Sequence, residues 1–337
     1  MSEKSENTQK LLLLQSSPHI ARQDSVPKIM TRVIVALLPV TVFGVVNFGI
    51  MALLNVAVSI AAAVVAEALF RRATKQEIRL KDCSAVVTGL LLALTLPPGI
   101  PLWMTALGAV FAIVVAKEFF GGLGANVFNP ALAGRAFMLM SFPAQMTTWL
   151  NPAKLAFRPD GSTGATPLAY LKTGEINDAL SGASALVPSQ FDLFLGFRGG
   201  CIGETSIFLV LIGGIYLLVT GTIDWRAPLG MLGSAALLSV CLGLGPVTTL
   251  LTGGLVFGAI FMATDYTSAP VTATGKLLFG IGAGIIVVLV RKFGSYPEGV
   301  MFSILIMNAV TPFLNRILHK KYGYIKPKKP AAQGGAK

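Results

Sequence analysis

Apolar residues gather in ten runs along the chain, and short polar segments separate these runs. Most of the runs approach the length that a helix needs to cross about 30 Å of hydrocarbon. The pattern therefore predicts an all-α polytopic membrane protein of about ten transmembrane helices. The predicted helices cover residues 31–49, 51–70, 83–97, 101–120, 128–143, 205–222, 227–245, 248–264, 275–291 and 299–317.

Proline or glycine interrupts the sequence at two of the shorter runs. The third run ends in the segment 95–101, which holds three prolines, and the fifth follows the glycine-rich segment 121–124. Such segments favour half-helices that end inside the membrane, and tight hairpins between full helices are the alternative. Five runs precede the longest loop and five follow it, and residues 126–135 resemble residues 308–316 in their spacing of Asn, Pro and Arg. These features favour a five-plus-five inverted repeat with broken helices.

The composition supports a membrane protein. Of the 337 residues, 54% are hydrophobic and 12% are charged, whereas soluble domains carry about 25% charged residues. The formal net charge of +12 does not indicate nucleic-acid binding, because the basic residues lie in short segments between apolar runs. With both termini in the cytoplasm, 20 of the 27 Lys and Arg residues are cytoplasmic, six are external and Arg135 lies within a span. The excess of basic residues in the cytoplasm favours this orientation.

This orientation divides the chain into five regions and places the longest loop outside a bacterial inner membrane. The regions are a cytoplasmic amino-terminal segment (1–30), helices 1–5 (31–143), an external, periplasmic loop (144–204), helices 6–10 (205–317) and a basic cytoplasmic tail (318–337). A loop of this length in a compact membrane protein is usually functional.

The sequence offers few ligands for a metal. His19 and His319 lie near the ends of the chain, so paired histidines cannot hold a haem within the membrane. Cys83, Cys201 and Cys241 are scattered, which excludes an iron–sulfur site of four cysteines. We therefore expect no metal site, no catalytic acid or base and no complete active site in this chain. An electron carrier bound here would be organic.

The predicted external loop contains the segment Asp-Gly-Ser-Thr-Gly-Ala-Thr-Pro at residues 160–167. Its small residues leave the backbone accessible, and it presents three hydroxyl groups. A hydroxyl becomes an effective nucleophile when a base and a metal activate it, so a modifying enzyme could transfer a phosphoryl-linked group to it. The spacing by itself favours an ordinary Asp-Gly turn.

This segment resembles the D-x-x-[ST]-G-A-[ST] target of the bacterial flavin transferase. That enzyme works outside the cytoplasmic membrane and moves FMN from FAD onto the last Ser or Thr of its target. The resemblance implies that Thr166 carries covalent FMN through the FMN phosphate. It also implies that the transferase recognises Asp160, Gly164 and Ala165.

The chain from about residue 20 to residue 317 resembles the NqrB/RnfD family of membrane subunits. The segments that carry this resemblance are 121–135, 203–206, 263–266 and 296–299. The longer amino-terminal region of NqrB proteins is absent, which favours RnfD, a membrane subunit of the Rnf ion-translocating electron transport complex. The resemblance implies a subunit that relays electrons in ferredoxin–NAD electron transfer coupled to Na⁺ or H⁺ translocation.

The same resemblance implies the partners of the chain. These are other Rnf subunits, especially a second subunit with covalent flavin (RnfG-like), together with the flavin transferase and membrane lipid. A second, non-covalent riboflavin is left open. The alternatives are an NqrB-like subunit of a sodium-pumping NADH:quinone reductase, a solute channel or transporter of the inverted-repeat type, and a structural membrane anchor.

Two further groups of residues are candidates for cofactor binding. Glu204, Thr205 and Ser206 open the sixth predicted helix, where free amides could hold a flavin phosphate. A plain helix cap by Thr205 or Ser206 is the alternative. Arg135 is costly inside a span, so we expect it to pair with a carboxylate or with a flavin phosphate.

Ion ligands are the last candidates. Four acidic residues lie near the ends of predicted spans, where they are either interfacial residues or ion ligands: Glu67, Glu118, Asp265 and Glu298. The interrupted segments 97–101 and 121–130 could instead offer free backbone carbonyls to a cation.

Overall fold

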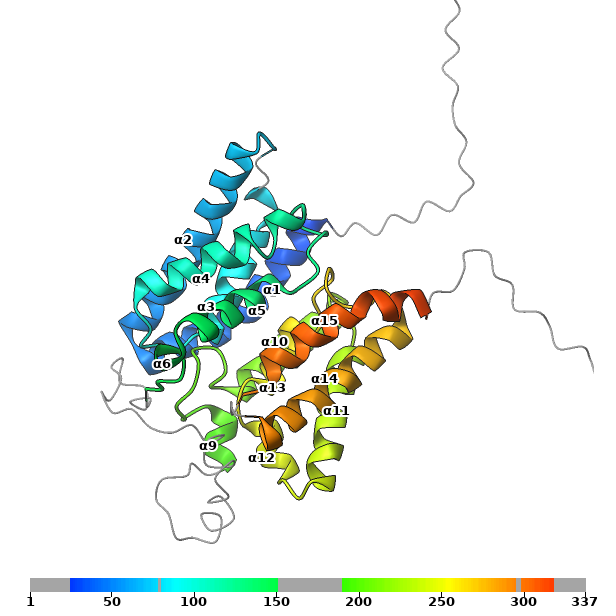
Figure 1. Ribbon diagram of the computed structural model, residues 1–337. Coiled ribbons are helices and arrows are strands. Elements are labelled where there is room, and N and C mark those ends of the chain that lie inside the picture. Colours follow the sequence, from blue (N-terminus) through cyan, green and yellow to red (C-terminus); the bar gives the residue numbers. More distant parts are fainter. Residues whose placement is uncertain (1–24, 78–79, 151–189, 295–297, 318–337) are drawn as a thin grey trace, which may run out of the picture.

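The computed structural model describes residues 25–77, 80–150, 190–294 and 298–317, and within them every regular element is a helix (Figure 1). The longer helices are α1 (Val26–Phe48), α2 (Ile50–Ala73), α3 (Ser84–Thr95), α4 (Leu102–Val114), α5 (Pro130–Ser141), α10 (Ile207–Val219), α11 (Arg226–Cys241), α14 (Ala273–Phe293) and α15 (Val300–Ile317). The short ones are η1 (Leu80–Asp82), η2 (Glu118–Phe120), α6 (Pro143–Met146), α9 (Gln190–Leu195), α12 (Pro246–Leu251), α13 (Leu255–Phe257) and the π-helix η4 (Gly258–Met262).

Each of the ten predicted apolar runs contains helix, which confirms the prediction of an all-α polytopic membrane protein. Within the described ranges, four segments are long and apolar enough to cross a membrane: Val26–Phe48, Ile50–Ala73, Leu102–Phe120 and Ala273–Phe293. Apolar helices of 10–17 residues follow most of the remaining runs, among them Ser84–Thr95 and Ile207–Val219. The eighth predicted run is the most broken one, because α12, α13 and η4 divide it.

The helices before the long loop and those after it form two groups that meet along one interface. Helix α2 packs against α3 and α4 in the first group, and α11 packs against α14 in the second. Between the groups, α1 contacts α10 and α5 contacts α15 (Figure 1). The first and sixth helices thus meet, as do the fifth and tenth, and the five-plus-five inverted repeat stays a prediction.

Helix α3 is too short to cross the hydrocarbon core of a bilayer, which is about 30 Å thick. Its 12 residues span about 18 Å at 1.5 Å per residue, and segment 96–101, which contains a turn, follows it. Asn55 on α2 is buried and donates its side-chain amide to the carbonyls of Pro98 (3.1 Å) and Ile100 (3.4 Å). These two carbonyls, expected as cation ligands, therefore have partners within the chain.

The molecule has two ends, which we name by their residues. The loop end holds segment 96–101, α6, α9 and the residues just before α15. The far end holds the start of α1, the end of α15 and the connections α2–α3 and α10–α11. Figure 1 shows α6 and α9 at the opposite side of the molecule from the start of α1 and the end of α15.

Candidate functional site

The predicted attachment residues Thr166, Asp160, Gly164 and Ala165 lie outside the described residues. The other four predicted cofactor residues lie together at the loop end. Arg135 comes from the middle of α5, and Glu204, Thr205 and Ser206 come from the segment just before α10. All four are buried.

Residues 196–206, which we call the re-entrant segment, fold back from the end of α9 into the interior. Gly196 begins this turn with a φ of 106°, a left-handed conformation that favours glycine. The backbone N–H groups of Ile202 and Gly203 then donate to the carbonyls of Leu96 (3.2 Å) and Leu94 (2.7 Å). The re-entrant segment thus satisfies carbonyls that the end of α3 leaves open.

The polar groups of the re-entrant segment have partners within the chain. The hydroxyl of Ser206 accepts a hydrogen bond from the backbone N–H of Leu209 and caps α10. The hydroxyl of Thr205 donates to the carbonyl of Ile202 at 3.5 Å. A role of these residues in holding a flavin phosphate stays a prediction, and it would require these contacts to be exchanged.

Arg135 lies at the centre of a buried group of charges. Its Nη1 donates to Glu204 Oε1 at 2.8 Å, and its Nη2 donates to Glu298 Oε2 and, at 3.4 Å, to Cys201 Sγ. We expected Arg135 to pair with a carboxylate or with a flavin phosphate, and in the structure its partners are the carboxylates of Glu204 and Glu298. One guanidinium therefore joins α5, the re-entrant segment and the residue two positions before α15.

Two further arginines complete this group, and both donate to backbone carbonyls around the break between α12 and α13. Arg198 Nη1 donates to Leu251 O, and its Nη2 donates to Glu204 O (2.6 Å) and Gly253 O (3.3 Å). Arg291 on α14 donates to Thr249 O (2.6 Å) and Thr252 O (3.0 Å). Cations at the carboxyl end of a helix interact favourably with its dipole. We name this set the loop-end cluster: Arg135, Arg198, Glu204, Arg291 and Glu298.

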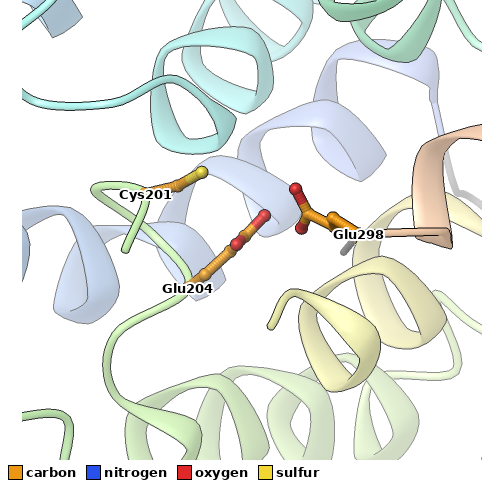
Figure 2. Close-up of side chains that lie close together, drawn as sticks. All are labelled: Cys201, Glu204 and Glu298. Atoms are coloured by element: carbon orange, nitrogen blue, oxygen red, sulfur yellow. The ribbon is translucent and has the colours of Figure 1, made fainter. Parts of the chain in front are cut away.

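Cys201, Glu204 and Glu298 resemble a metal site in their arrangement. Their ligand atoms lie within 4.8 Å of one another, and Figure 2 shows the three side chains converging on one point. However, the guanidinium of Arg135 already contacts all three. The loop-end cluster holds three positive and two negative groups, so a further cation would be repelled. The arrangement fits a guanidinium better than a metal ion.

A second buried group of charges, the far-end cluster, joins α2 to the end of α4. Lys117 Nζ lies 2.9 Å from Glu67 Oε2 and donates to Ser84 Oγ at 2.6 Å. Arg71 Nη2 lies 3.4 Å from Glu67 Oε1 and 3.1 Å from Glu118 Oε1. The two bases and two acids balance in charge. Glu67 and Glu118, expected as interfacial residues or ion ligands, are thus buried in ion pairs.

Two adjoining cavities lie at the far end, one within the second helix group and one between the two groups. The outer one measures about 450 Å³ and is bounded by the α10–α11 connection, residues 263–271 and the first turn of α14. The inner one measures about 80 Å³ and extends to Lys117 and to the start of α5 at Pro130. Both are lined by five common residues: Thr222, Ile223, Thr264, Asp265 and Tyr266. The carboxylate of Asp265 accepts hydrogen bonds from the hydroxyls of Thr267 and Ser268.

Asp224 is a charged residue at the wall of the outer cavity, in the connection between α10 and α11. Burial by itself would raise its pKa, but the backbone N–H and guanidinium of Arg226, together with Lys276, hold the pKa below its usual value. Asp224 therefore stays ionised over the physiological pH range.

Sequence reasoning missed how deeply several charges are buried. Arg198, Arg291 and Lys117 counted as loop charges in the orientation argument, yet each is less than 10% exposed. A weak signal existed for Arg291, because it lies in the last turn of a long apolar run. No local pattern indicates that Arg198 contacts the α12–α13 break, because the contacts span 53 and 55 residues of sequence.

Comparison with known proteins assigns the chain to a family. Residues 13–323 match the model of the NQR2, RnfD, RnfE family. The chain is 45% identical over 325 residues to the D subunit of the Na(+)-translocating ferredoxin:NAD(+) oxidoreductase complex of Acetobacterium woodii, covering 95% of this chain and 98% of that protein. It is 44% identical over 316 residues to the D subunit of the proton-translocating ferredoxin:NAD(+) oxidoreductase complex of Clostridium ljungdahlii, covering 91% of this chain and 94% of that protein. A third relative is the D subunit of the ion-translocating oxidoreductase complex of Stutzerimonas stutzeri. It is 39% identical over 333 residues, covering 89% of this chain and 93% of that protein. The chain belongs to the NQR2, RnfD, RnfE family.

Proposed function

We propose that this chain is a membrane subunit of an ion-translocating electron-transport complex. In this role it relays electrons in ferredoxin–NAD electron transfer that is coupled to Na⁺ or H⁺ translocation. The observation that carries the proposal is the likeness, over more than nine-tenths of the chain, to the two relatives named for that reaction. One of those names gives Na⁺ and the other gives the proton, so the likeness does not choose the ion.

The proposed electron carrier is FMN, joined through its phosphate to the hydroxyl of Thr166. The segment 160–166 supports this assignment, because every defined position of the flavin transferase target is present. The flavin supplies the redox chemistry, and the protein supplies binding, orientation and electrostatics. No side chain of the described residues is assigned as a catalytic acid or base.

The first experiment tests the attachment. The chain is produced together with the flavin transferase, run on a denaturing gel and viewed under ultraviolet light. We expect a fluorescent band for the wild type and for Ser162→Ala, which removes a hydroxyl at an undefined position of the target, and no fluorescence for Thr166→Ala. A dark wild-type band, or a fluorescent Thr166→Ala band, would contradict the proposal.

The proposed location is the bacterial inner membrane, with both termini in the cytoplasm and the loop of residues 144–204 in the periplasm. The distribution of Lys and Arg supports this orientation. The proposed partners are the other subunits of the complex, in particular a second subunit with a covalent flavin on the same side of the membrane.

A second, non-covalent riboflavin is also proposed, and the far-end cavities are the place we assign to it. The outer cavity, at about 450 Å³, lies in the size range of small-molecule sites, about 300–1,000 Å³. Its walls combine apolar residues with the aromatic side chains of Trp225 and Tyr266 and with hydroxyl groups such as that of Thr222. Such mixed walls are typical of sites for small molecules and cofactors.

This second site is tested by precipitating the protein with acid and analysing the supernatant by mass spectrometry. We expect riboflavin from the wild type and much less from Thr264→Phe, which narrows both cavities. Covalent fluorescence on the gel serves as the folding control for the variant. A wild-type supernatant without riboflavin would contradict this part of the proposal.

Two assays separate the proposal from its alternatives. The purified complex should reduce NAD⁺ with electrons from ferredoxin. Reduction of quinone by NADH instead would favour an NqrB-like subunit. Passage of a neutral solute through proteoliposomes of this chain, without any covalent flavin, would favour a channel or transporter.

A further inference from the structure

The two roots of the long loop, residues 142–150 and 190–206, converge on one short segment of the fold. Leu150 in the first root lies against Gly99, since a Cβ on Gly99 would lie 3.1 Å from Leu150 Cδ1. The second root contains the re-entrant segment, whose residues Ile202 and Gly203 bond the carbonyls of Leu96 and Leu94. The end of α3 and the connection 96–101 therefore hold both ends of the loop.

Close backbone approach makes the second root a tight fit. A Cβ on Gly203 would lie 2.6 Å from Leu94 Cβ, and a Cβ on Gly254 would lie 2.4 Å from Glu204 Oε1. Neither distance is possible for real side chains without a shift of the backbone or of Glu204. The re-entrant segment is thus enclosed by α3 on one side and by the α12–α13 break on the other.

The loop-end cluster ties this root to both helix groups. Arg135 links α5 of the first group to Glu204 in the root and to Glu298 in the second group. Arg198 links the root to the carbonyls of Leu251 and Gly253 in the second group. Burying so many charges has a desolvation cost that often exceeds the gain from pairing. Stability alone therefore does not explain why these charges are buried. A role in fixing the orientation of the second root between the helix groups does explain it.

We propose that Arg135 is a positioning residue for the redox group carried on the long loop, acting through Glu204 and Glu298 to fix the second root between the helix groups. This inference rests on the proposed function, because it assumes a flavin on Thr166. A group carried on a loop is positioned only as well as the ends of that loop. Electron transfer to a neighbouring cofactor requires a defined separation, so fixed roots limit the volume that the flavin can sample.

The native cysteines provide a direct test of this role. Cys241 is exposed at the loop end of α11 and takes the label, whereas Cys83 and the buried Cys201 are changed to Ser for the distance measurement. Cys201, which lies beside Arg135, is kept for the separate alkylation measurement, in which Cys83 and Cys241 are changed to Ser. A nitroxide on Cys241 and the flavin semiquinone on Thr166 form a pair for pulsed EPR distance measurement in the full chain. The test variants are Arg135→Met, which removes both ion pairs, and Arg135→Lys, which keeps the charge and loses the fork of donors. Arg72→Met, at the exposed end of α2 and outside both cavities, is the control.

We expect a narrow distance distribution in the wild type and in Arg72→Met, a broad one in Arg135→Met, and an intermediate one in Arg135→Lys. Covalent flavin content stays unchanged in all of them. Alkylation of Cys201 by maleimide should become about tenfold faster in Arg135→Met, because local opening exposes a buried thiol. If Arg135→Met does not fold, Arg135→Lys and Glu298→Gln carry the same expectation of a broader distribution.

A narrow distribution in folded Arg135 variants, with covalent flavin present, would overturn the positioning role and leave the proposed function intact. A wild-type chain without covalent flavin would overturn the proposed function and this inference together. Thr166→Ala identifies the signal, because it removes the semiquinone of the attached flavin and leaves any other flavin in place.

Discussion

Lys117 is a fully buried amine, and its contacts explain how the far end tolerates a charge. Its side chain is 2% exposed, and it lies between Glu67 and Ser84. A buried charge without a partner costs several kcal/mol, so each member of the far-end cluster depends on the others. Lys276, by contrast, forms a partly exposed ion pair: its side chain is 29% exposed, and its Nζ lies 3.4 Å from Asp224 Oδ2.

The contrast between the two lysines gives a stability prediction. Lys117→Met should lower the free energy of unfolding by about 3–5 kcal/mol, because it leaves Glu67 buried with a weaker set of partners. Lys276→Met should cost about 0–1 kcal/mol, as for partly exposed pairs. Thermal unfolding in detergent, followed with a thiol-reactive dye, compares the two variants.

A second variant separates the loss of a charge pair from the loss of packing. Changing Glu67→Gln together with Lys117→Met removes both charges, so we expect the double variant to be more stable than Lys117→Met alone. Equal unfolding temperatures for Lys117→Met and Lys276→Met would contradict the assignment of the far-end cluster as a buried, mutually dependent set.

Helices α11 and α14 form the closest helix pair of the second group, and glycine makes their approach possible. A Cβ on Gly280 would lie 2.3 Å from the carbonyl oxygen of Ala227, and a Cβ on Gly284 would lie 2.3 Å from that of Met231. Small residues at such interfaces let helix backbones pack closely in membranes, where hydrophobicity supplies no force between helices. The glycine content of the sequence is therefore in part a packing feature.

Two glycines of this helix pair are a matched test. Gly280→Ala should destabilise the protein by about 1–3 kcal/mol, because the neighbouring atom is backbone and cannot move freely. Gly233→Ala, in α11 where nothing lies within 4 Å of the added Cβ, should be neutral or stabilising by up to about 1 kcal/mol, because alanine favours helix. Chemical unfolding in detergent measures both, and destabilisation by Gly233→Ala as large as that by Gly280→Ala would count against the interface described.

At each described helix break, backbone carbonyls that have no partner within their own helix accept hydrogen bonds from other parts of the chain. The carbonyls around the α12–α13 break accept from Arg198 and Arg291, and those at the end of α3 accept from the re-entrant segment. Backbone groups in a membrane must be satisfied internally, so a break needs donors from elsewhere in the chain. Here the donors are guanidinium and amide groups, and these carbonyls are not free for a cation.

At the scale of the whole molecule, the two helix groups place the loop roots at one end and the cavities at the other. The orientation of these ends in the membrane stays a prediction from the distribution of basic residues. It is testable because Cys241 lies at the loop end and Cys83 at the far end.

Single-cysteine variants resolve the orientation, with Cys201→Ser in both. We expect a membrane-impermeant maleimide to label Cys241 in right-side-out vesicles and Cys83 in inverted ones, because the excess of Lys and Arg retains the far end in the cytoplasm. Labelling of the two cysteines in the reverse pattern would overturn the predicted topology, and labelling after detergent solubilisation confirms that both thiols can react.

The apolar runs by themselves determined that the chain is an all-α membrane protein and where its helices lie, because transfer of a segment into hydrocarbon depends on its own composition and length. The three prolines and the glycine of segment 95–101 likewise marked the break after α3, because proline and glycine act on the local backbone. The sequence also marked Arg135 as a charge that needs a partner.

Only the tertiary structure decided which partner that is. Glu204 and Glu298 lie 69 and 163 residues away from Arg135, and nothing local indicates either of them. The burial of Arg198, Arg291 and Lys117 was undecidable from sequence for the same reason. The cost of removing a charge from water is offset only by groups that the fold brings to it, so charge pairing is a property of the assembled helices.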